Sequence, residues 1–434
     1  MRSLSVAFII GIFMGSAVAE QLSATSLSIF LIALFGAAIF LRSERLRTII
    51  FFVAFFTSGV LRIGIGEEFL QLQGIAASFI PLRNQLAEGF AQYGITGDEN
   101  AVVTAMSLGD KSGISSSLKS VYSQAGASHV LALSGMHLAI IYVILSWGVM
   151  RTILWLHAVP ELLWEKLPVE RNEKLKNVIR KLLCLRPSEL TLRNIATVVI
   201  MLMIWFYVIL VGMSPSVVRS ALMLTIYGLS RMLFRQTDTI TVLAITAFVT
   251  LMLSPQSLFD VGFQMSYLAV LGIGVYMPRL MQLVYKTDAN WSEDASIITL
   301  CNIIMWVYSS LALSFSAQIM VMPLVAYYFH TLPCYGLLSS LVVSVTAMLI
   351  VGASLFFLVA LYLMPMFVCE CAAYTLNAVT HFQNVFLERI TALPFAVVED
   401  IQINFWQLII IYLLIFCVSK ILFILQRPSY PSSR

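Results

Sequence analysis

Charged residues are scarce in this chain of 434 residues, since Asp, Glu, Lys and Arg make up 11% of it and hydrophobic residues make up 60%. An ordinary soluble domain is about one quarter charged and about half apolar. So few polar side chains cannot cover a water-facing surface, which excludes a soluble globular domain and a disordered chain. The apolar runs are continuous and not alternating, which argues against a porin-like barrel. We predict an all-α, polytopic membrane protein with roughly 9–12 transmembrane or re-entrant helices.

Residues for metal and nucleotide chemistry are also few. The chain has five His and six scattered Cys, and none of them forms pairs with the spacing of a zinc site. Gly109-Asp110-Lys111-Ser112 lacks the adjacent Gly-Lys of a P-loop, and no HExxH motif is present. We therefore predict no cofactor and no metal, and no ATPase motif is visible.

Apolar runs of membrane-spanning length give the expected spans. They are residues 4–19, 26–41, 48–62, 129–150, 194–213, 215–233, 239–253, 258–277 and 404–425, with overlong stretches at 297–330 and 335–364. In the stretch at 297–330, Ser314, Ser316 and Gln318 precede Pro323, which suggests a broken helix.

The distribution of basic residues sets the expected orientation. Residues 151–193 hold nine Lys and Arg against five Glu, so the positive-inside rule places this loop in the cytoplasm. Counting back through the spans places residues 63–128 outside and the N-terminus in the cytoplasm. Arg2 and Ala17-Val18-Ala19 also resemble a signal peptide with its cleavage site. Apolar segments follow immediately and favour an uncleaved span, and both alternatives keep the N-terminus inside.

Three regions follow from this reading. Residues 1–62 carry N-terminal transmembrane helices. Residues 63–128 are an external linker with short amphipathic helices, for example around 82–93 and 99–108. Residues 129–434 carry the remaining spans and the cytoplasmic loop at 151–193.

A first polar cluster consists of His129, Ser134 and His137. Ionisable groups inside a membrane are costly, so each is a functional candidate. Ser134 and His137 are three apart and would share a helix face. Such a pair can act as nucleophile and base, but no orienting acid and no nucleophile elbow lies nearby. A polar face that lines a water-filled passage, or hydrogen bonds between helices, is the favoured interpretation.

A second cluster is centred on Arg219. Ser214, Pro215 and Ser216 have the pattern of a helix start, and Arg219 follows about one turn later. An Arg in an apolar helix must face protein or water. We expect it either to snorkel or pair with Asp260, or to meet an anion in a pore.

A third cluster begins at Asp260. Asp260, Gln264 and Tyr267 can share one face of a helix, given their spacings of four and three. The alternative for Asp260 is a capping role at an outer helix end.

Four sequence blocks resemble signatures of the ComEC competence-protein family. Residues 129–138 (HVLALSGMHL) resemble its HLLAISGLHV signature, and Leu108-Gly109-Asp110 resembles its LGD element. Residues 212–223, 254–273 and 314–330 are similar to the second, third and fourth signatures, in family order. The resemblance covers roughly residues 82–350. The residues that carry it include Gly109, Asp110, Gly135, Pro215, Gly262, Ser266 and Pro323.

The resemblance implies an inner-membrane channel, not an enzyme, that passes single-stranded DNA from periplasm to cytoplasm. Implied partners are a cytoplasmic helicase-like ATPase or strand-binding proteins, a periplasmic DNA receptor and, where one strand is degraded, a separate nuclease. The candidates for the pore or DNA path are His129, Ser134, His137, Ser214, Ser216, Arg219, Asp260, Phe263, Gln264, Tyr267 and Gln318.

The sequence departs from full-length members of that family in two ways. We expect an OB-type domain to be absent or reduced to a remnant near residues 63–77, and we expect no metallo-β-lactamase-like domain after the last span. Two alternatives therefore stay open. One is a transporter or flippase for another anionic polymer or lipid, and the other is an intramembrane hydrolase that uses Ser134 and His137.

Overall fold

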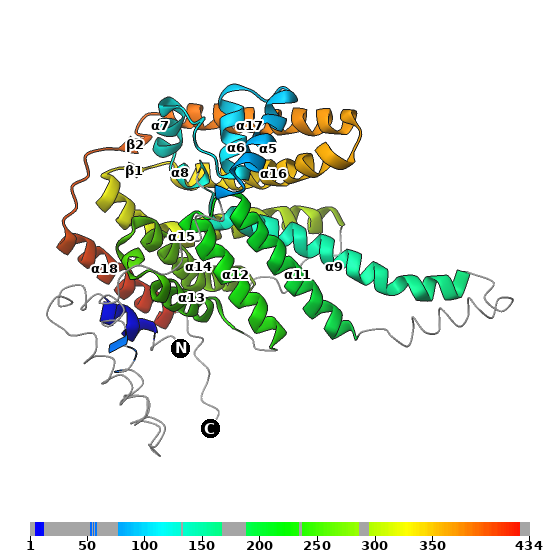
Figure 1. Ribbon diagram of the computed structural model, residues 1–434. Helices are drawn as coiled ribbons and strands as arrows, with labels where there is room; N and C mark the ends of the chain where they lie inside the picture. Colours follow the sequence, from blue (N-terminus) through cyan, green and yellow to red (C-terminus); the bar gives the residue numbers. More distant parts are fainter. Residues whose placement is uncertain are drawn as a thin grey trace, which may run out of the picture. The chain divides into compact units, whose positions relative to one another are not determined.

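The computed structural model describes residues 5–12, 53, 55, 57, 58, 77–131, 133–166, 188–233, 237–285 and 295–425. Within these residues the fold is helical, and the only strands are β1 (Leu332–Pro333) and β2 (Val397–Val398), which pair antiparallel. The order of the elements is visible in Figure 1. The predicted all-α class is confirmed.

The helices have the following bounds. They are α5 (Ile80–Gln92), α6 (Gly97–Leu108), α7 (Ser116–Gln124), α8 (Ser128–Leu131), α9 (Gly135–Lys166), α11 (Glu189–Leu210), α12 (Pro215–Met232), α13 (Thr239–Leu253), the 3-10 helix η3 (Pro255–Phe259), α14 (Val261–Tyr285), α15 (Ala295–Phe329), α16 (Gly336–Leu363), α17 (Met366–Thr391) and α18 (Phe405–Leu425).

The chain forms two compact units, and each is described by itself. Unit 1 comprises Met1–Ser115, His129–Pro255 and Val345–Phe382. Unit 2 comprises Ser116–Ser128, Gln256–Ser344 and Gln383–Arg434. Both units are therefore assembled from three separate stretches of sequence, and α16 and α17 contribute to both.

Five helical segments in the described residues are long and apolar enough to cross a membrane. They are Gly135–Ile153, Glu189–Leu210, Val261–Leu283, Cys301–Phe329 and Gly336–Leu363, and Thr239–Leu253 and Phe405–Ile421 are shorter apolar helices. These helices match seven of the predicted stretches. The expected span at 26–41 lies outside the described residues, and those at 4–19 and 48–62 lie mostly outside them.

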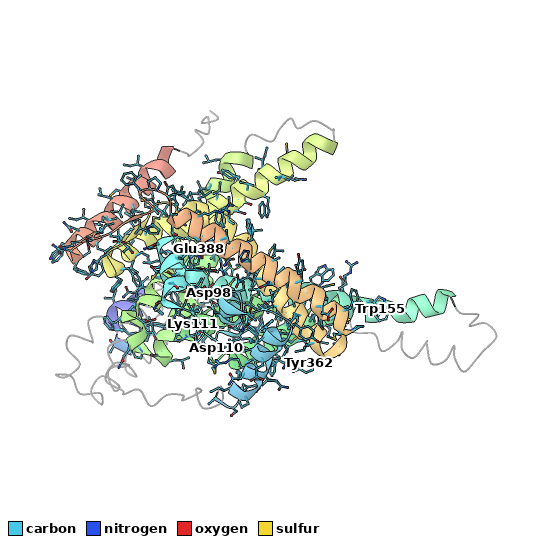
Figure 2. All side chains as sticks on the ribbon, turned by 90° about the horizontal axis from the view of Figure 1, so that it is seen from above. Asp98, Asp110, Lys111, Trp155, Tyr362 and Glu388 are labelled. Atoms are coloured by element: carbon cyan, nitrogen blue, oxygen red, sulfur yellow. The ribbon has the colours of Figure 1, made fainter. Side chains whose placement is uncertain are left out.

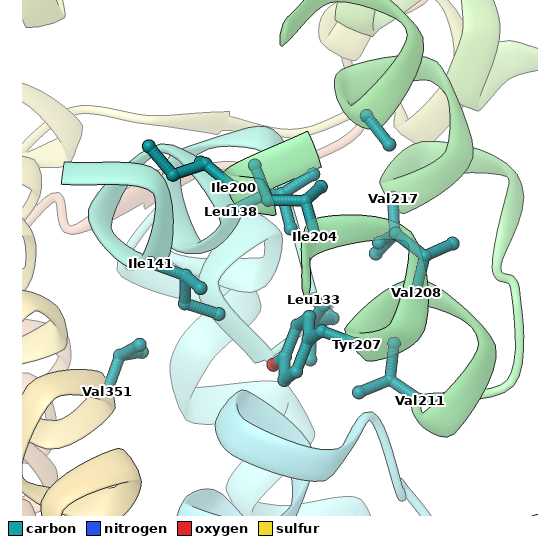
Figure 3. Close-up of a cluster of buried hydrophobic side chains, with 11 residues drawn as sticks. Leu133, Leu138, Ile141, Ile200, Ile204, Tyr207, Val208, Val211, Val217 and Val351 are labelled. Atoms are coloured by element: carbon teal, nitrogen blue, oxygen red, sulfur yellow. The ribbon is translucent and has the colours of Figure 1, made fainter. Parts of the chain in front are cut away.

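The core of unit 1 lies where α9, α11 and α12 pack against one another. On α11 the buried residues Ala196, Ile200, Ile204 and Val208 recur every four positions, so they form one stripe along the helix. Figure 3 shows Ile200, Ile204 and Val208 of this stripe in one cluster with Leu138 and Ile141 of α9 and Val217 of α12. In unit 2 the most extensive helix contact joins α14 and α15.

The predicted cytoplasmic loop is shorter than expected. Helix α9 continues to Lys166 and α11 begins at Glu189, so the ends of the expected loop at 151–193 are helical, and residues 167–187 lie outside the described part. At 1.5 Å per residue, α9 is about 48 Å long and exceeds a hydrocarbon core of about 30 Å. A helix that is longer than the hydrocarbon core is thick can continue into water, where charged residues do not end it.

Two further expectations were wrong in detail. Helices α5 and α6 occur where amphipathic helices were predicted, but α6 buries every residue from Ala101 to Leu108 and is not amphipathic there. Helix α15 is continuous through Pro323 and is not broken. Its polar residues need no break, because Ser316 donates to the carbonyl of Ala312 in its own helix at 2.6 Å. Neighbouring groups can also compensate a proline inside a membrane helix.

Candidate functional site

The LGD element ends α6 and packs on the turn between α11 and α12. Gly109 has a left-handed φ of 73°, and a Cβ there would lie 3.0 Å from the carbonyl oxygen of Val211 and 3.8 Å from Leu133. Only glycine permits both the backbone conformation and this approach. Figure 2 labels Asp98, Asp110 and Lys111, which lie on α6 and the loop after it. Blocks distant in sequence therefore meet in unit 1.

A hydrogen bond between α11 and α6 fixes the same meeting point. The Tyr207 hydroxyl donates to the carbonyl oxygen of Ser107 at 2.6 Å, and both residues are buried. After α11 the chain turns through Met213, which has a left-handed φ of 53°. That conformation is uncommon for a residue with a side chain and costs about 1–3 kcal/mol. Surrounding contacts must hold the turn that leads into α12.

Ser134 and His137 form a hydrogen-bonded pair at the start of α9. The Ser134 backbone N–H donates to His137 Nδ1 at 3.1 Å, and Ser134 Oγ lies 2.9 Å from the same nitrogen. Because a backbone N–H can only donate, Nδ1 is the acceptor and the ring proton sits on Nε2. The bond from the Ser134 N–H is one half of a capping box, with His137 in the place usually taken by Glu or Gln.

The arrangement favours a structural role for this pair. The lone pair of Nδ1 already accepts the Ser134 backbone N–H, and a catalytic triad also needs an acceptor for the second ring nitrogen. His137 is fully buried, and its Nε2 has no hydrogen-bond partner among the described residues. His129, in contrast, is exposed on the short helix α8. No group of three His, Cys, Asp or Glu that could hold a metal occurs among the described residues.

Helix α9 approaches α12 closely at its first residue. A Cβ on Gly135 would lie 2.7 Å from Ser220 Oγ, and that hydroxyl donates to the carbonyl of Ser216 at 3.0 Å. The first and second signatures are thus packed against each other. Pro215 occupies the first turn of α12 and Ser214 its N-cap position, so the predicted helix start is confirmed.

Arg219 lies in the second turn of α12 and is buried, with 4% of its surface exposed. It faces protein, which is one of the two surroundings expected for an Arg in an apolar helix, and it does not snorkel. Asp260 belongs to unit 2, so the pairing of Arg219 with Asp260 stays a prediction.

In unit 2 Asp260 caps α14. Its Oδ2 accepts the backbone N–H of Phe263 at 2.9 Å, three residues on, which is an N-cap contact. The capping contact is therefore present, and the position of this helix end on the outer side of the membrane stays a prediction. Phe263 is buried and its ring lies 4.2 Å from that of Tyr267, centroid to centroid. Gly262 and Ser266 lie in the same first turns of the helix.

The polar residues of the third and fourth signatures hold unit 2 together. Gln264 Nε2 donates to the carbonyl of Leu258 at 3.0 Å, and the Tyr328 hydroxyl donates to Gln264 Oε1 at 3.2 Å. Gln318 Nε2 donates to the Gly336 carbonyl and to Ser340 Oγ, both at 3.1 Å. These contacts join the start of α14 to α15 and α15 to α16.

A buried polar group on α17 escaped sequence analysis. Gln383 Nε2 donates to the Tyr122 hydroxyl at 2.8 Å, which donates to Asn384 Oδ1 at 2.7 Å. All three residues are buried. Helix α17 contains Glu370, Glu388 and Arg389 and is not among the membrane-span candidates. The signal that could have indicated it is the helical spacing of Cys369, Ala373 and Leu376, which are buried on α17.

The described helices define a multi-pass, α-helical membrane protein whose signature residues gather in two packed units. The family model for Competence protein matches residues 106–424, so the chain belongs to the Competence protein family. It is also similar to the ComE operon protein 3 of Bacillus subtilis (strain 168), at 23% identity over 238 residues. That match covers 54% of this chain and 23% of the relative, so the chain aligns with less than a quarter of the relative's length. No solved structure matches the chain.

Proposed function

We propose that this protein is an inner-membrane channel that passes single-stranded DNA from the periplasm into the cytoplasm. The observation that carries the proposal is the convergence of the LGD element and the first two signatures in unit 1. Membership of the Competence protein family supports the same substrate. The channel itself is not an enzyme in this proposal.

Buried Arg219 is the residue most suited to a DNA path. A strand-binding passage of low sequence preference uses cations that meet phosphates and aromatic faces that stack on bases. Arg219 lies one turn inside α12, where the positive end of the helix dipole adds to its charge. Tyr267 of unit 2 is partly exposed and supplies an aromatic face. We place His129, Ser134, Ser214, Ser216, Gln264 and Gln318 along or beside the passage.

The energetics of transport imply partners. Moving an anion inward against an inside-negative potential costs about 2.3 kcal/mol per charge per 100 mV, and every nucleotide carries a phosphate. We therefore infer a cytoplasmic helicase-like ATPase or strand-binding proteins that draw the strand in. A periplasmic receptor would deliver the DNA, and a separate nuclease would degrade the other strand.

The orientation belongs to the same proposal. The basic residues from Arg151 in α9 to Arg193 in α11 lie in the cytoplasm in this proposal, by the positive-inside rule. Helices α5 and α6 then lie outside and the N-terminus lies inside. Insertion of a protease site near Lys111 in the loop after α6 and another between residues 167 and 187, cut from the periplasmic side in spheroplasts, would test this. Cleavage at the second site alone would contradict the orientation.

The decisive experiment follows labelled double-stranded DNA in a strain lacking this protein and in a complemented strain. We expect DNA to enter the periplasm in both strains and to reach the cytoplasm only in the complemented one. Equal delivery to the cytoplasm in both would overturn DNA transport, and a transporter for another anionic polymer or lipid would take its place.

Substitutions at Arg219 test the path. We expect Arg219→Lys to keep partial transport and Arg219→Glu to abolish it, each at normal protein abundance, because a cation attracts phosphate and a carboxylate repels it. Arg231→Gln is the matched control, since Arg231 is an exposed Arg in the last turn of the same helix. Equal transport by all variants would remove Arg219 from the path.

Substitutions at Ser134 separate a channel from a hydrolase. The capping interaction predicts that Ser134→Ala lowers transport only mildly, whereas Ser134→Trp blocks it. A hydrolase would instead lose all turnover of its substrate in Ser134→Ala while still binding it.

A further inference from the structure

Helix α5 of unit 1 carries a cation, Arg83, to the turn between α11 and α12. The rings of Phe79 and Phe206 meet edge to face with their centroids 5.9 Å apart, which joins the start of α5 to α11. One helical turn further along α5, Nη1 of Arg83 lies 3.5 Å from the position that a Cβ on Gly212 would take. The guanidinium therefore lies against the turn that leads into α12.

The guanidinium of Arg83 has hydrogen-bond donors that the described part of the chain does not use. An Arg carries five N–H donors in a fork that fits a phosphate. Nε of Arg83 is buried and has no hydrogen-bond partner among the described residues. The residue as a whole is partly exposed, so a ligand from outside can reach it. Burying a charged donor without a partner destabilises a fold, which points to a partner that binds from solution.

The charges around the LGD element leave an excess of positive charge there. The pKa of the Asp110 carboxyl is lowered first by the hydrogen bond from the Ser112 backbone and, to a smaller extent, by Arg83. Asp110 Oδ1 accepts that backbone N–H at 3.0 Å, so part of this carboxylate is already bound by the protein. Lys111 follows in the same loop and is exposed. Two cations therefore occur with one carboxylate in this part of unit 1.

The start of α12 adds to the attraction for an anion at this turn. Its N-cap residue Ser214 is partly exposed and makes no side-chain capping hydrogen bond. The positive end of the helix dipole is therefore not neutralised by that side chain and acts on the same turn as Arg83. Arg83 carries the full charge, and the dipole only supplements it. In the proposed orientation this end of α12 lies on the outer side of the membrane.

We propose that Arg83 binds a phosphate of single-stranded DNA as the strand enters from the outer side. This inference rests on the proposed function and adds the residue that receives the strand before it reaches Arg219, which lies one turn inside α12. Phosphate contacts position a strand and carry no sequence information. Binding at Arg83 is therefore the same for every base.

The test is binding of a fluorescently labelled oligothymidylate to the full-length protein purified in detergent. Anisotropy at several salt concentrations gives the slope of log K against log salt, to which each neutralised phosphate of a single strand contributes about −0.7. Arg83→Gln should reduce the magnitude of this slope by about 0.7 and weaken binding severalfold at low salt. Arg83→Lys should keep the slope and bind more weakly, because a Lys keeps the charge but lacks the fork. A labelled oligoadenylate should show the same changes.

Two further variants separate a ligand contact from a packing role. Lys119→Gln removes an exposed cation of α7 and should leave both the affinity and the slope as in the wild-type protein. Arg83→Met keeps an unbranched side chain and removes the charge. Because Nε of Arg83 has no partner in the described part of the chain, Arg83→Met should keep or raise the melting temperature while it weakens DNA binding as Arg83→Gln does.

The role of Arg83 and the proposed function can fail separately. If the wild-type protein binds neither oligonucleotide, the proposed function loses its substrate and this inference falls with it. If the wild-type protein binds DNA and Arg83→Gln has an unchanged slope, the role of Arg83 alone is overturned. It is also overturned if Arg83→Met melts at a lower temperature, which would identify a partner within the protein. Displacement of the oligonucleotide by inorganic phosphate at equal phosphate concentration would identify a small anion as the occupant and overturn it too.

Discussion

Two helix contacts, one in each unit, have a glycine at the point of close approach, but different kinds of atom limit the space beside it. In unit 1 the space next to Gly135 of α9 is limited by the side chain of Ser220 on α12. In unit 2 the space next to Gly272 of α14 is limited by the backbone carbonyl of Ser316 on α15. Small residues let membrane helices approach closely in both cases. A side chain can rotate away, but a carbonyl within a helix cannot.

The difference separates an adjustable contact from a fixed one. The α9–α12 contact joins the first and second signatures, which contain most of the proposed DNA path. The α14–α15 contact joins the third and fourth signatures and, through Gln318, the start of α16. We therefore expect substitutions at the first contact to change transport before they remove the protein, and substitutions at the second to remove the protein.

The largest expected effect comes from Gly272→Ala. A Cβ at this position overlaps the Ser316 carbonyl oxygen, so α14 and α15 must separate, and overpacking of this kind costs about 1–3 kcal/mol or more. We expect a severalfold loss of folded protein in the membrane, measured by size-exclusion chromatography of a fluorescent fusion. Gly148→Ala is the control, because no atom lies within 4 Å of a Cβ there.

A smaller effect, which a second substitution should correct, is expected at the α9–α12 contact. Gly135→Ala would place its Cβ 2.7 Å from Ser220 Oγ, and removing that oxygen leaves the Ser220 Cβ at 3.6 Å. Gly135→Ala should lower the melting temperature, and the double variant Gly135→Ala, Ser220→Ala should regain most of it. If the double variant is as unstable as the single one, backbone atoms limit this contact too, and the contrast between the units fails.

Two tyrosines sharpen the comparison with matched substitutions. The hydroxyl of Tyr207 donates to Ser107 in buried surroundings, whereas that of Tyr412 donates to the carbonyl of Met320 at 2.8 Å in partly buried surroundings. Tyr207→Phe leaves a buried acceptor without its donor and should cost about 1–3 kcal/mol. Tyr412→Phe should cost about 0.5–1.5 kcal/mol. Thermal melts of both variants would check the order, and a reversed order would contradict it.

The smallest effect concerns pH and Asp110. The backbone N–H of Ser112 donates to Asp110 Oδ1 at 3.0 Å and holds the pKa of this carboxyl below its ordinary value. Because the folded pKa is lowered, the stabilisation is present above the unfolded pKa and is lost as pH falls through the folded one. Asp110→Asn should lessen the loss of stability below about pH 4, by less than about 1 kcal/mol because the group is solvated. Identical melting curves against pH would remove this contribution.

Hydropathy and local spacing were enough to predict much of the fold. The apolar runs located α11, α14, α16 and α18 to within a few residues, apart from the longer C-terminal end of α14. The start of α12 followed from Ser214 and Pro215. These features depend on residues close in sequence, where the physical causes act locally.

The rest depends on contacts between residues far apart in the chain. Nothing near Gln318 in sequence indicates its hydrogen bond to Gly336, and nothing near Ala101 indicates that α6 is buried. The sequence placed Ser134 and His137 on one face, but the capping geometry appeared only when the exact start of α9 was known. Arg219 was expected to face protein or water and it is buried, because the cost of an Arg in lipid is a local property.

The hydrogen bonds of helix α17 constrain the order in which parts of unit 2 can fold during synthesis. The hydroxyl of Tyr122 is buried and bonds Gln383 and Asn384, 261 and 262 residues later in the chain. At a synthesis rate of about 5–20 residues per second, helix α7 emerges roughly 13–52 seconds before its partners exist. During that interval Tyr122 must stay hydrated or be shielded by a chaperone. Unit 2 therefore cannot complete its folding until residues 383 and 384 have been synthesised. We expect quality-control proteases to recognise a chain that is interrupted before residue 383.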